Sequence, residues 1–342
     1  MIKCSIYSLT LKELEDYLVS INDKKFRATQ IYDWLYIKRV KDFNSMTNLS
    51  KNLIDKLNED FSIFSLKIVT KQESSLVSKY LIELNDNNRV EAVLMNHDYG
   101  NSLCISTQVG CNMGCHFCES GRLKKVRNLD SSEMIMQILA IEESSNIRIS
   151  HIVLMGIGEP FDNYDNFTKF IEIINNPKGI NLGSRHITVS TCGIVPKIIE
   201  FSDFPYQVNL AISLHAPNNF IRDKIMSINK VYKIEELIKA IKYYIKKTNR
   251  RVTFEYIMLD SINDTKECAL ELAKLLKGIN CYVNLIPYNE TENIGFKRSS
   301  KVNIDNFYDT LKKQNICVTV RREFGGKIDA ACGQLRAKGE KK

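Results

Sequence analysis

The chain has 342 residues, 44% of them hydrophobic and 26% charged, so it can bury a sizeable core. No apolar run approaches the ~20 residues that cross a bilayer, and the polar N-terminus does not resemble a signal peptide. We therefore expect a cytoplasmic protein without membrane spans. The net charge of +8 permits binding to a polyanion, but a solvated basic surface explains it equally well.

Residues 1–75 are predicted to form a small, locally basic helical module. A capping box at 10–13 begins the first helix, and apolar residues at helical spacing predict two more, at 28–38 and 50–57. Two apolar runs, 79–84 and 89–95, then flank an Asn/Asp cluster, which is typical of a β-hairpin. We place this connecting hairpin at residues 76–100.

Strands and helices alternate over residues 101–320. The predicted strands are 103–107, 151–155, 186–190, 208–213, 252–258 and 282–286, and the predicted helices are 132–143, 164–174, 234–245, 266–276 and 305–313. Six βα units imply an α/β fold with a parallel sheet or a partial barrel. Right-handed crossovers bring the carboxyl ends of all strands to one face, where ligands bind in such folds.

Three of the ten cysteines form a cluster with the spacing C-x3-C-x2-C: Cys111, Cys115 and Cys118. Thiolates suit iron–sulfur clusters and zinc. Three thiolates can hold three irons of a [4Fe-4S] cluster and leave the fourth open to a small chelating ligand. A structural zinc site needs a fourth protein ligand, and His116 is adjacent to Cys115, so it is poorly placed to converge on the same ion. We favour the cluster, with zinc or coincidence as alternatives.

With Phe117 before the third cysteine, this loop resembles the radical S-adenosylmethionine signature. The whole chain closely resembles the RlmN/Cfr family of RNA adenine methyltransferases, nearly end to end. The matching segments are KFRATQI (25–31) with Trp34, RVE (89–91), CISTQVGC (104–111), GIGEP (156–160), STCG (190–193), SLHAP (213–217) and IDAACGQL (328–335).

The resemblance implies a partial (βα)6 radical-SAM barrel with a small N-terminal helical module and a connecting hairpin. It also implies one [4Fe-4S] cluster on the three cysteines and two molecules of S-adenosylmethionine per turnover. The cofactor contacts that it implies are Gly158, Glu159, Ser190, Ser213, Leu214, His215 and Asn289. Without the resemblance, a Gly-rich turn and isolated polar residues at strand ends have ordinary structural explanations.

The family also implies three catalytic residues. Cys332, in a C-terminal tail over 321–342, carries a methyl group as a thioether, and Cys104 helps to resolve a protein–RNA adduct. Glu91 matches the proton acceptor. One S-adenosylmethionine methylates Cys332; a second is cleaved to a radical that activates this methyl group for addition to adenine. A lone cysteine is more often buried packing, and a hairpin glutamate is usually solvated. The other cysteines are interpreted as packing residues: Cys4, Cys192, Cys268, Cys281 and Cys317.

RlmN-type enzymes methylate carbon 2 of an adenosine in the peptidyl-transferase centre of 23S rRNA, and often a tRNA anticodon-loop adenosine. Cfr-type enzymes methylate carbon 8 of the same rRNA base and confer antibiotic resistance. Segments 25–34 and 284–289 resemble RlmN more closely. Glu119 stands where Ala or Ser is commoner and changes the polarity beside the cluster, so carbon 8 stays an alternative.

The expected partners are 23S rRNA, tRNA and an electron donor such as flavodoxin or ferredoxin, and we expect a monomer. Among the basic runs, 124–127 and 321–322 lie near catalytic motifs and are favoured as RNA contacts.

Two other classes of function compete: a non-catalytic RNA-binding protein with an iron–sulfur or zinc site, and a radical enzyme that acts on a small molecule. The first leaves Cys332 and Glu159 without a role, and the second gives no reason for the basic N-terminal module.

Overall fold

The N-terminal helices form where the sequence predicts them. The computed structural model describes residues 3–291, 294–321 and 334. In the capping box, the Thr10 side chain accepts the backbone N–H of Glu13, and the Glu13 carboxylate accepts that of Thr10. The predicted second helix begins as an α-helix and ends as a π-helical segment. The elements are α1 (Leu11–Ser20), α2 (Arg27–Tyr32), η2 (Asp33–Ile37) and α3 (Lys51–Asp60).

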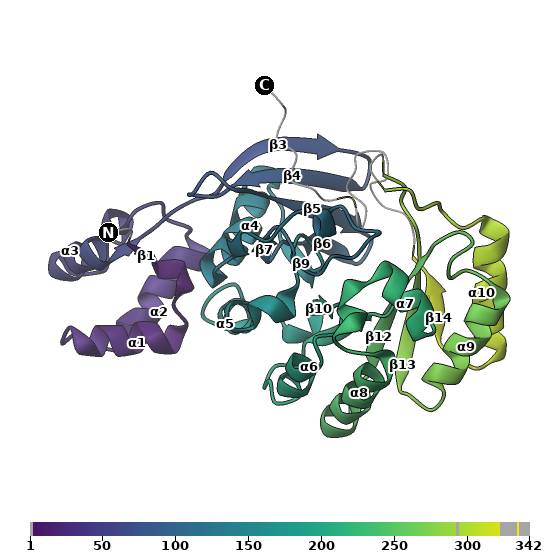
Figure 1. The fold of residues 1–342 in the computed structure, drawn as a ribbon. Helices are drawn as coiled ribbons and strands as arrows, with labels where there is room; N and C mark the ends of the chain where they lie inside the picture. Colours follow the sequence, from purple (N-terminus) through teal and green to yellow (C-terminus); the bar gives the residue numbers. More distant parts are fainter. Residues whose placement is uncertain (1–2, 292–293, 322–333, 335–342) are drawn as a thin grey trace.

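A strongly curved ten-stranded sheet forms the centre of the fold (Figure 1). Its strands follow the order β14-β13-β12-β11-β10-β9-β6-β5-β4-β3, with β6 and β9 to β14 parallel. The six predicted strands are present, and β14 is an addition. The parallel strands are β6 (Gly100–Cys104), β9 (Ile149–Leu154), β10 (Ile187–Thr191), β11 (Asn209–Ser213), β12 (Val252–Met258), β13 (Cys281–Pro287) and β14 (Val318–Val320).

The predicted hairpin is part of this same sheet. Its strands are β4 (Val77–Glu83) and β5 (Arg89–His97), and β5 pairs antiparallel with β6, so that Val93 lies opposite Cys104. A strand that the sequence did not predict, β3 (Lys67–Glu73), pairs with β4 and forms one edge of the sheet. The hairpin therefore extends the barrel wall as well as joining it to the N-terminal helices.

Helices cover the outer face of the parallel strands (Figure 1). The five predicted helices are present, and two short ones that were not predicted, α6 and α7, follow β10 and β11. The helices are α4 (Ser131–Ser145), α5 (Tyr164–Asn175), α6 (Val195–Phe201), α7 (Asn219–Ile225), α8 (Ile234–Thr248), α9 (Lys266–Leu276) and α10 (Lys301–Lys313).

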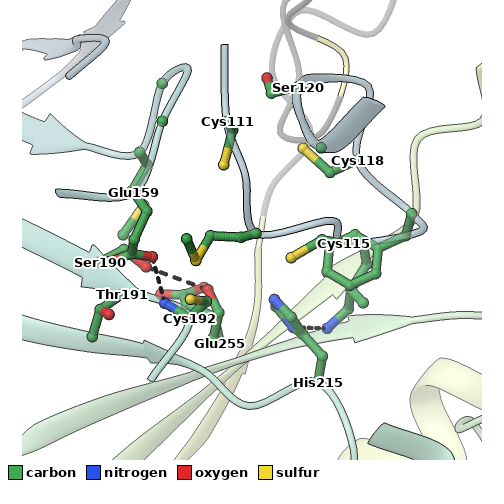
Figure 2. Close-up of a pocket in the computed structure, with 18 of the residues that line it drawn as sticks. Cys111, Cys115, Cys118, Ser120, Glu159, Ser190, Thr191, Cys192, His215 and Glu255 are labelled. Carbon is green, nitrogen blue, oxygen red and sulfur yellow. Dashed lines mark hydrogen bonds between the residues drawn. The ribbon is translucent and has the colours of Figure 1, made fainter. Parts of the chain in front are cut away.

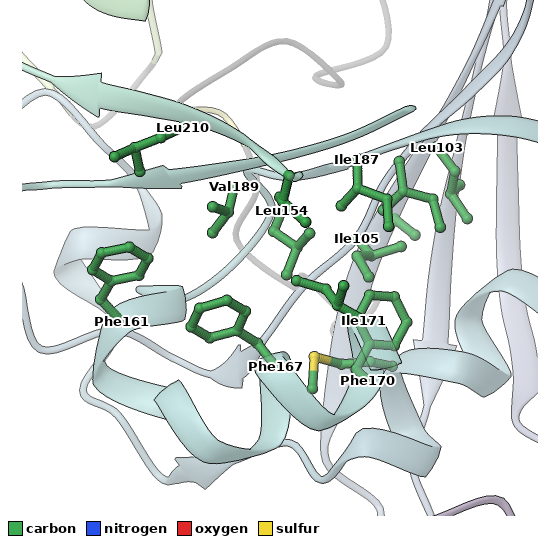
Figure 3. Packing of buried hydrophobic residues seen from close by; sticks show 14 of the residues in the cluster. Leu103, Ile105, Leu154, Phe161, Phe167, Phe170, Ile171, Ile187, Val189 and Leu210 are labelled. Atoms are coloured by element: carbon green, nitrogen blue, oxygen red, sulfur yellow. The ribbon is translucent and has the colours of Figure 1, made fainter. Parts of the chain in front are cut away.

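The two faces of the sheet differ in chemistry. Leu103 and Ile105 point into the large apolar core shared with the helices, together with Phe167 and Phe170 of α5 (Figure 3). Cys104 points to the opposite, inner face and packs in a separate cluster with Val93 and others. The alternation of side chains along a strand explains this division. The inner face carries polar residues as well as apolar ones and is available to form the site.

The N-terminal helices are fastened to α4. Arg39 forms an ion pair with the buried carboxylate of Glu142, and Lys41 Nζ lies 2.6 Å from a carboxylate oxygen of Glu143. The apolar cores of the two parts are continuous. Among the described helices, none is long and apolar enough to cross a membrane.

Candidate active site

A short, tightly folded loop presents the three clustered cysteines. It leaves β7 (Gln108–Val109) and returns through β8 (Arg127–Asn128), which pairs antiparallel with β7. Cys111 donates its backbone N–H to Leu123 at 3.0 Å, and Cys118 donates to Cys115 at 3.1 Å. These bonds fix the loop so that all three cysteines line one pocket (Figure 2).

This pocket opens at the carboxyl ends of the parallel strands, as the sequence predicts for an α/β fold. Figure 2 shows the cysteines together with Glu159, Ser190 and His215 around it. The predicted cofactor contacts that line it are Gly158, Glu159, Ser190, Ser213 and His215. Residues from four segments distant in the sequence therefore converge on one small cavity.

The thiols of the loop suit a soft, electron-poor metal centre. Burial raises the pKa of Cys111 to about 12 and that of Cys115 well above its usual value, so a cation is needed to make thiolates here. Within the described ranges, no three or more His, Cys, Asp or Glu side chains are arranged to hold a single metal ion. An iron–sulfur cube makes a different demand, because each thiolate binds its own iron. The donor set therefore fits a [4Fe-4S] cluster with one iron free of protein ligands.

Glu159 is a buried carboxylate held at the pocket wall by backbone donors. It accepts the N–H groups of Cys192 at 2.8 Å and Phe161 at 3.0 Å. Burial raises its pKa, and these hydrogen bonds oppose the rise. Its own N–H donates to Gln108, which lies against the backbone of Gly158. A carboxylate so placed can accept hydrogen bonds from the ammonium group of an amino-acid ligand.

His215 is neutral and oriented. Its backbone has φ +58°, and its Nδ1 accepts the N–H of Ile257 at 3.0 Å. Burial lowers the pKa of His215 to about 3, so the ring stays uncharged at neutral pH and carries its proton on Nε2. The hydroxyls of Ser190 and Ser213 lie 3.4 Å apart at the ends of β10 and β11. Together these groups offer neutral donors and acceptors of the kind that bind a ribose or a carboxylate.

Two predicted cofactor contacts do not line the pocket with their side chains. Leu214 is fully buried in the core, and its N–H donates to the carbonyl of Glu255 at 3.1 Å. Asn289 is half-buried two residues beyond β13 and is not among the residues that form the pocket wall. Their assignment as contacts stays a prediction.

Arg222 bonds to backbone carbonyls of the pocket wall, although no sequence motif singled it out. This fully buried guanidinium donates to the carbonyls of Cys192 at 2.7 Å, Leu214 at 3.1 Å and Ser213 at 3.2 Å. It therefore ties together the loops that leave β10 and β11. An isolated arginine in a short polar stretch gives no sequence signal, because arginine is usually exposed.

Two further residues line the pocket that the sequence did not predict as site residues. Cys192, interpreted from sequence as a packing residue, forms part of the wall beside Glu159. Glu255, on the inner face of β12, is buried and accepts a hydrogen bond from Asn284 at 2.8 Å. Burial raises the pKa of Glu255, and the positive charge of Arg321 opposes this. Alternation along β12 is the signal that could have placed Glu255 inside.

The proposed catalytic residues of the first strands share the inner face of the sheet. Cys104 is buried in an apolar cluster with Met95 and Ile157, against which Met155 of the pocket wall packs. Glu91 is only 2% exposed and pairs with Lys79, so it is not solvated as hairpin glutamates usually are. Cys332 lies outside the described residues.

Glu119, the unusual residue after the third cysteine, is buried but does not contribute to the pocket wall as described. Its neighbour Ser120 does line the pocket. The extra carboxylate is therefore beside the cysteine loop without facing directly into the cavity.

Two family models match the chain. Residues 4–63 match the ribosomal RNA large subunit methyltransferase N-terminal domain, and residues 105–276 match the radical SAM superfamily. The second match contains the cysteine loop and the strands that carry Glu159, Ser190 and His215.

Known proteins resemble the chain over nearly its full length. A protein from Spiroplasma citri named "Probable dual-specificity RNA methyltransferase RlmN" is 55% identical over 98% of each chain. Its namesake from Acholeplasma laidlawii is 54% identical over 97% of this chain and 98% of its own. The crystal structure of a radical SAM methyltransferase from Sphaerobacter thermophilus superposes with a TM-score of 0.92 at 40% identity, covering 98% of this chain and all of that one.

Proposed function

The chain belongs to the RlmN family of radical S-adenosylmethionine RNA methyltransferases, and from this membership we propose its reaction. The enzyme methylates carbon 2 of one adenosine in the peptidyl-transferase centre of 23S rRNA, and also an adenosine in a tRNA anticodon loop. The observation that carries the proposal is the convergence of the three clustered cysteines with Glu159 and strands β9 to β13 on one pocket.

Cys111, Cys115 and Cys118 would hold a [4Fe-4S] cluster, and Glu159 would bind the ammonium group of S-adenosylmethionine. When bound, the cluster supplies the electron for reductive cleavage of the sulfonium. The chain itself orients the ligand: Ser190 and Ser213 offer hydroxyls, while neutral His215 offers a fixed N–H donor. The remaining cofactor contacts in the proposal are Gly158, Leu214 and Asn289. The buried wall around them excludes water from the reacting groups.

Three residues act on the methyl group and the adenine. Cys332 accepts a methyl group from one S-adenosylmethionine and presents it to the ring, and a second molecule is used to activate it. Cys104 helps to break the bond between Cys332 and the RNA. Glu91 accepts the proton that leaves the ring carbon. The inner-face positions of Cys104 and Glu91, on paired neighbouring strands, support this division of roles.

The domain plan belongs to the same proposal. Residues 1–75 act as an RNA-binding accessory module, 76–100 connect it to the barrel over 101–320, and the tail 321–342 delivers Cys332. A cytoplasmic monomer that receives electrons from flavodoxin or ferredoxin fits this scheme.

Methylation of carbon 8 is the competing reaction within the family. The match of residues 4–63 to the ribosomal RNA large subunit methyltransferase N-terminal domain and the names of the relatives favour the RlmN-type reaction. Mass spectrometry of digested rRNA and tRNA, from cells with and without the gene, tests the proposal directly. We expect 2-methyladenosine in both RNAs only when the gene is present. A gene-dependent 8-methyladenosine signal in its place would reject the carbon-2 assignment.

A further inference from the structure

A second cavity lies inside the barrel, towards the amino ends of its strands. It encloses about 660 Å³ and shares Met155, Glu255 and Arg321 with the cysteine pocket. Its wall is largely polar. Side chains that point inwards from the strands, such as those of Thr188 and Thr253, are polar, whereas those that point outwards are apolar. Four guanidiniums and one carboxylate line it, a formal excess of three positive charges.

Three of these guanidiniums, from Arg185, Arg250 and Arg251, come from the segments just before β10 and β12. None of the three forms an ion pair with a carboxylate elsewhere in the described chain. Neutral contacts orient them instead: Arg185 Nε donates to Gln207 at 2.8 Å, Arg250 Nη1 lies 3.2 Å from the hydroxyl of Tyr244, and Arg251 lies over the ring of Tyr282. The part of the cavity at the amino ends of the strands, its rim, is therefore positively charged, and neutral partners orient its three guanidiniums.

The basic run beside the cysteine loop is arranged differently. Arg127 forms ion pairs with both oxygens of Glu133 and with Asp86, and Lys125 Nζ lies 2.7 Å from Asp162. The charges of Lys125 and Arg127 are already compensated within the chain, which argues against the predicted RNA contact at residues 124–127. Arg250 and Arg251, which lie outside the two runs favoured from sequence, have the better-placed charges.

A row of imidazole and aromatic rings begins next to Arg185. His186 follows Arg185, and its Nδ1 lies 3.0 Å from His151 Nε2. His151 also contacts the ring of Tyr99, which is 66% exposed and stacks on His97. Arginine next to exposed flat rings is a combination that contacts the phosphates and bases of single-stranded RNA.

We propose that this arginine-lined cavity binds backbone phosphates of the RNA strand that carries the target adenosine. The inference rests on the proposed RNA substrate and adds a contact site for it. Arg251 stands immediately before β12 and precedes Glu255 by four residues. At about 3.3 Å per residue, it lies about 13 Å from the point where the two cavities meet. An adenine in the cysteine pocket thus leaves its neighbouring phosphates within the basic cavity.

The test is a salt titration of RNA binding by the full chain, purified anaerobically with its cluster. A labelled RNA stem–loop with adenosines in its loop is the probe, and R185Q/R251Q is the variant. We expect weaker binding at every KCl concentration and a salt-dependence slope smaller by about 1.5, because each lost phosphate contact removes about 0.7–0.9 from the slope. Lysine replacement, R185K/R251K, keeps the charges and should retain most of the slope.

The matched control is K239Q/K242Q, which removes two exposed charges from the outer side of α8 and should leave the slope unchanged. Equal slopes for wild type and R185Q/R251Q, or an equal decrease in the control, would overturn the proposal. Tight, arginine-dependent binding of AMP or inorganic phosphate alone would assign the cavity to a free phosphate compound instead. A wild-type chain that binds the stem–loop with the expected slope yet leaves it unmethylated would reject the proposed function alone.

Discussion

Lys79 Nζ lies 3.4 Å from Glu91 Oε1 on the inner face of the sheet, where both side chains are almost completely buried. The two residues come from the neighbouring strands β4 and β5, which the ten-stranded sheet encloses between β3 and β6. A carboxylate in this position keeps a defined orientation towards the barrel interior. The proposed proton acceptor is therefore positioned by a lysine that no sequence motif had marked.

Replacing Lys79 by methionine should destabilise the protein by roughly 3 kcal/mol, because it removes a positive charge that faces a buried carboxylate. The exposed pair Lys12–Asp16 provides the control, and Lys12→Met should cost less than about 1 kcal/mol. Urea unfolding followed by circular dichroism measures both. The double variant K79M/E91L should recover part of the loss; equal losses in K79M and K12M would show that the buried pair has no special weight.

Replacing Glu159 by glutamine should weaken S-adenosylmethionine binding by roughly 10- to 100-fold, because a hydrogen bond to a charged group contributes about 1.5–3 kcal/mol. The amide oxygen can still accept one of the two backbone N–H groups, whereas the amide NH2 cannot accept the other, so circular dichroism is used to check that the variant is folded. Equilibrium dialysis with labelled ligand gives the dissociation constant. Glu200→Gln, on the exposed face of α6, should bind as the wild type does. An unchanged constant for E159Q would remove Glu159 from the proposed contacts.

Replacing Gly158 by alanine should cost more stability than the strained backbone conformation alone, because the new Cβ would also collide with the pocket wall. Gly158 has φ +110°, and a Cβ there would lie 2.7 Å from the Cβ of Gln108, which bonds to Glu159. Gly278 also has a positive φ, +77°, but nothing lies within 4 Å of its Cβ position. We expect each variant to lose about 1–3 kcal/mol from strain, with a larger loss and reduced S-adenosylmethionine binding only in Gly158→Ala. Thermal unfolding and ligand binding that are alike in the two variants would contradict this.

The buried, neutral His215 should make the protein less stable in acid. Its folded pKa, about 3, lies below the value near 6.5 of an unfolded histidine. The unfolded chain therefore gains a proton first, and the stability contribution present above pH 6.5 is lost as the pH falls towards 3. In His215→Asn, whose amide oxygen can accept the Ile257 N–H, this component is absent. The stability difference between wild type and variant, measured by urea unfolding, should shrink as the pH falls. A constant or growing difference would contradict the neutral assignment.

Replacing each of the two proposed catalytic cysteines should stop the reaction at a different step. A Cys332→Ala chain should keep its iron and sulfide yet transfer no methyl group, because the methyl acceptor is gone. A Cys104→Ala chain should instead accumulate a covalent protein–RNA species, because adduct formation precedes the step that Cys104 assists. Denaturing gels with labelled RNA and mass spectrometry of nucleosides distinguish the two. Methyl transfer at the normal rate by the first variant, or clean release of methylated RNA by the second, would reject the respective role.

The sequence predicts best where local signals and tertiary structure agree. The strand at 252–258 and the helix at 266–276 appear residue for residue, because one is a buried run bordered by polar residues and the other begins with a capping Thr265. By contrast, β3 is largely exposed and polar, and α7 has only seven residues, so neither gives a periodic apolar pattern.

The site shows the same limit. Spacing and motif order indicated the cysteines and most cofactor contacts. Burial could not be inferred for residues whose role depends on distant partners, such as Arg222, which bonds to carbonyls that follow two different strands, and Glu91, which is buried because β5 lies inside a wide sheet.

The outermost strand β3 has the features of a sheet edge that does not pair with another chain. Most of its side chains are exposed and polar or charged, including Lys67, Lys71 and Glu73, and its register with β4 shifts between Ile68 and Thr70. Charges and irregular pairing at an open strand discourage another chain from adding its own strand there. The antiparallel part of the sheet, which buries Glu91, thus ends in an edge strand whose charges and irregular pairing disfavour aggregation.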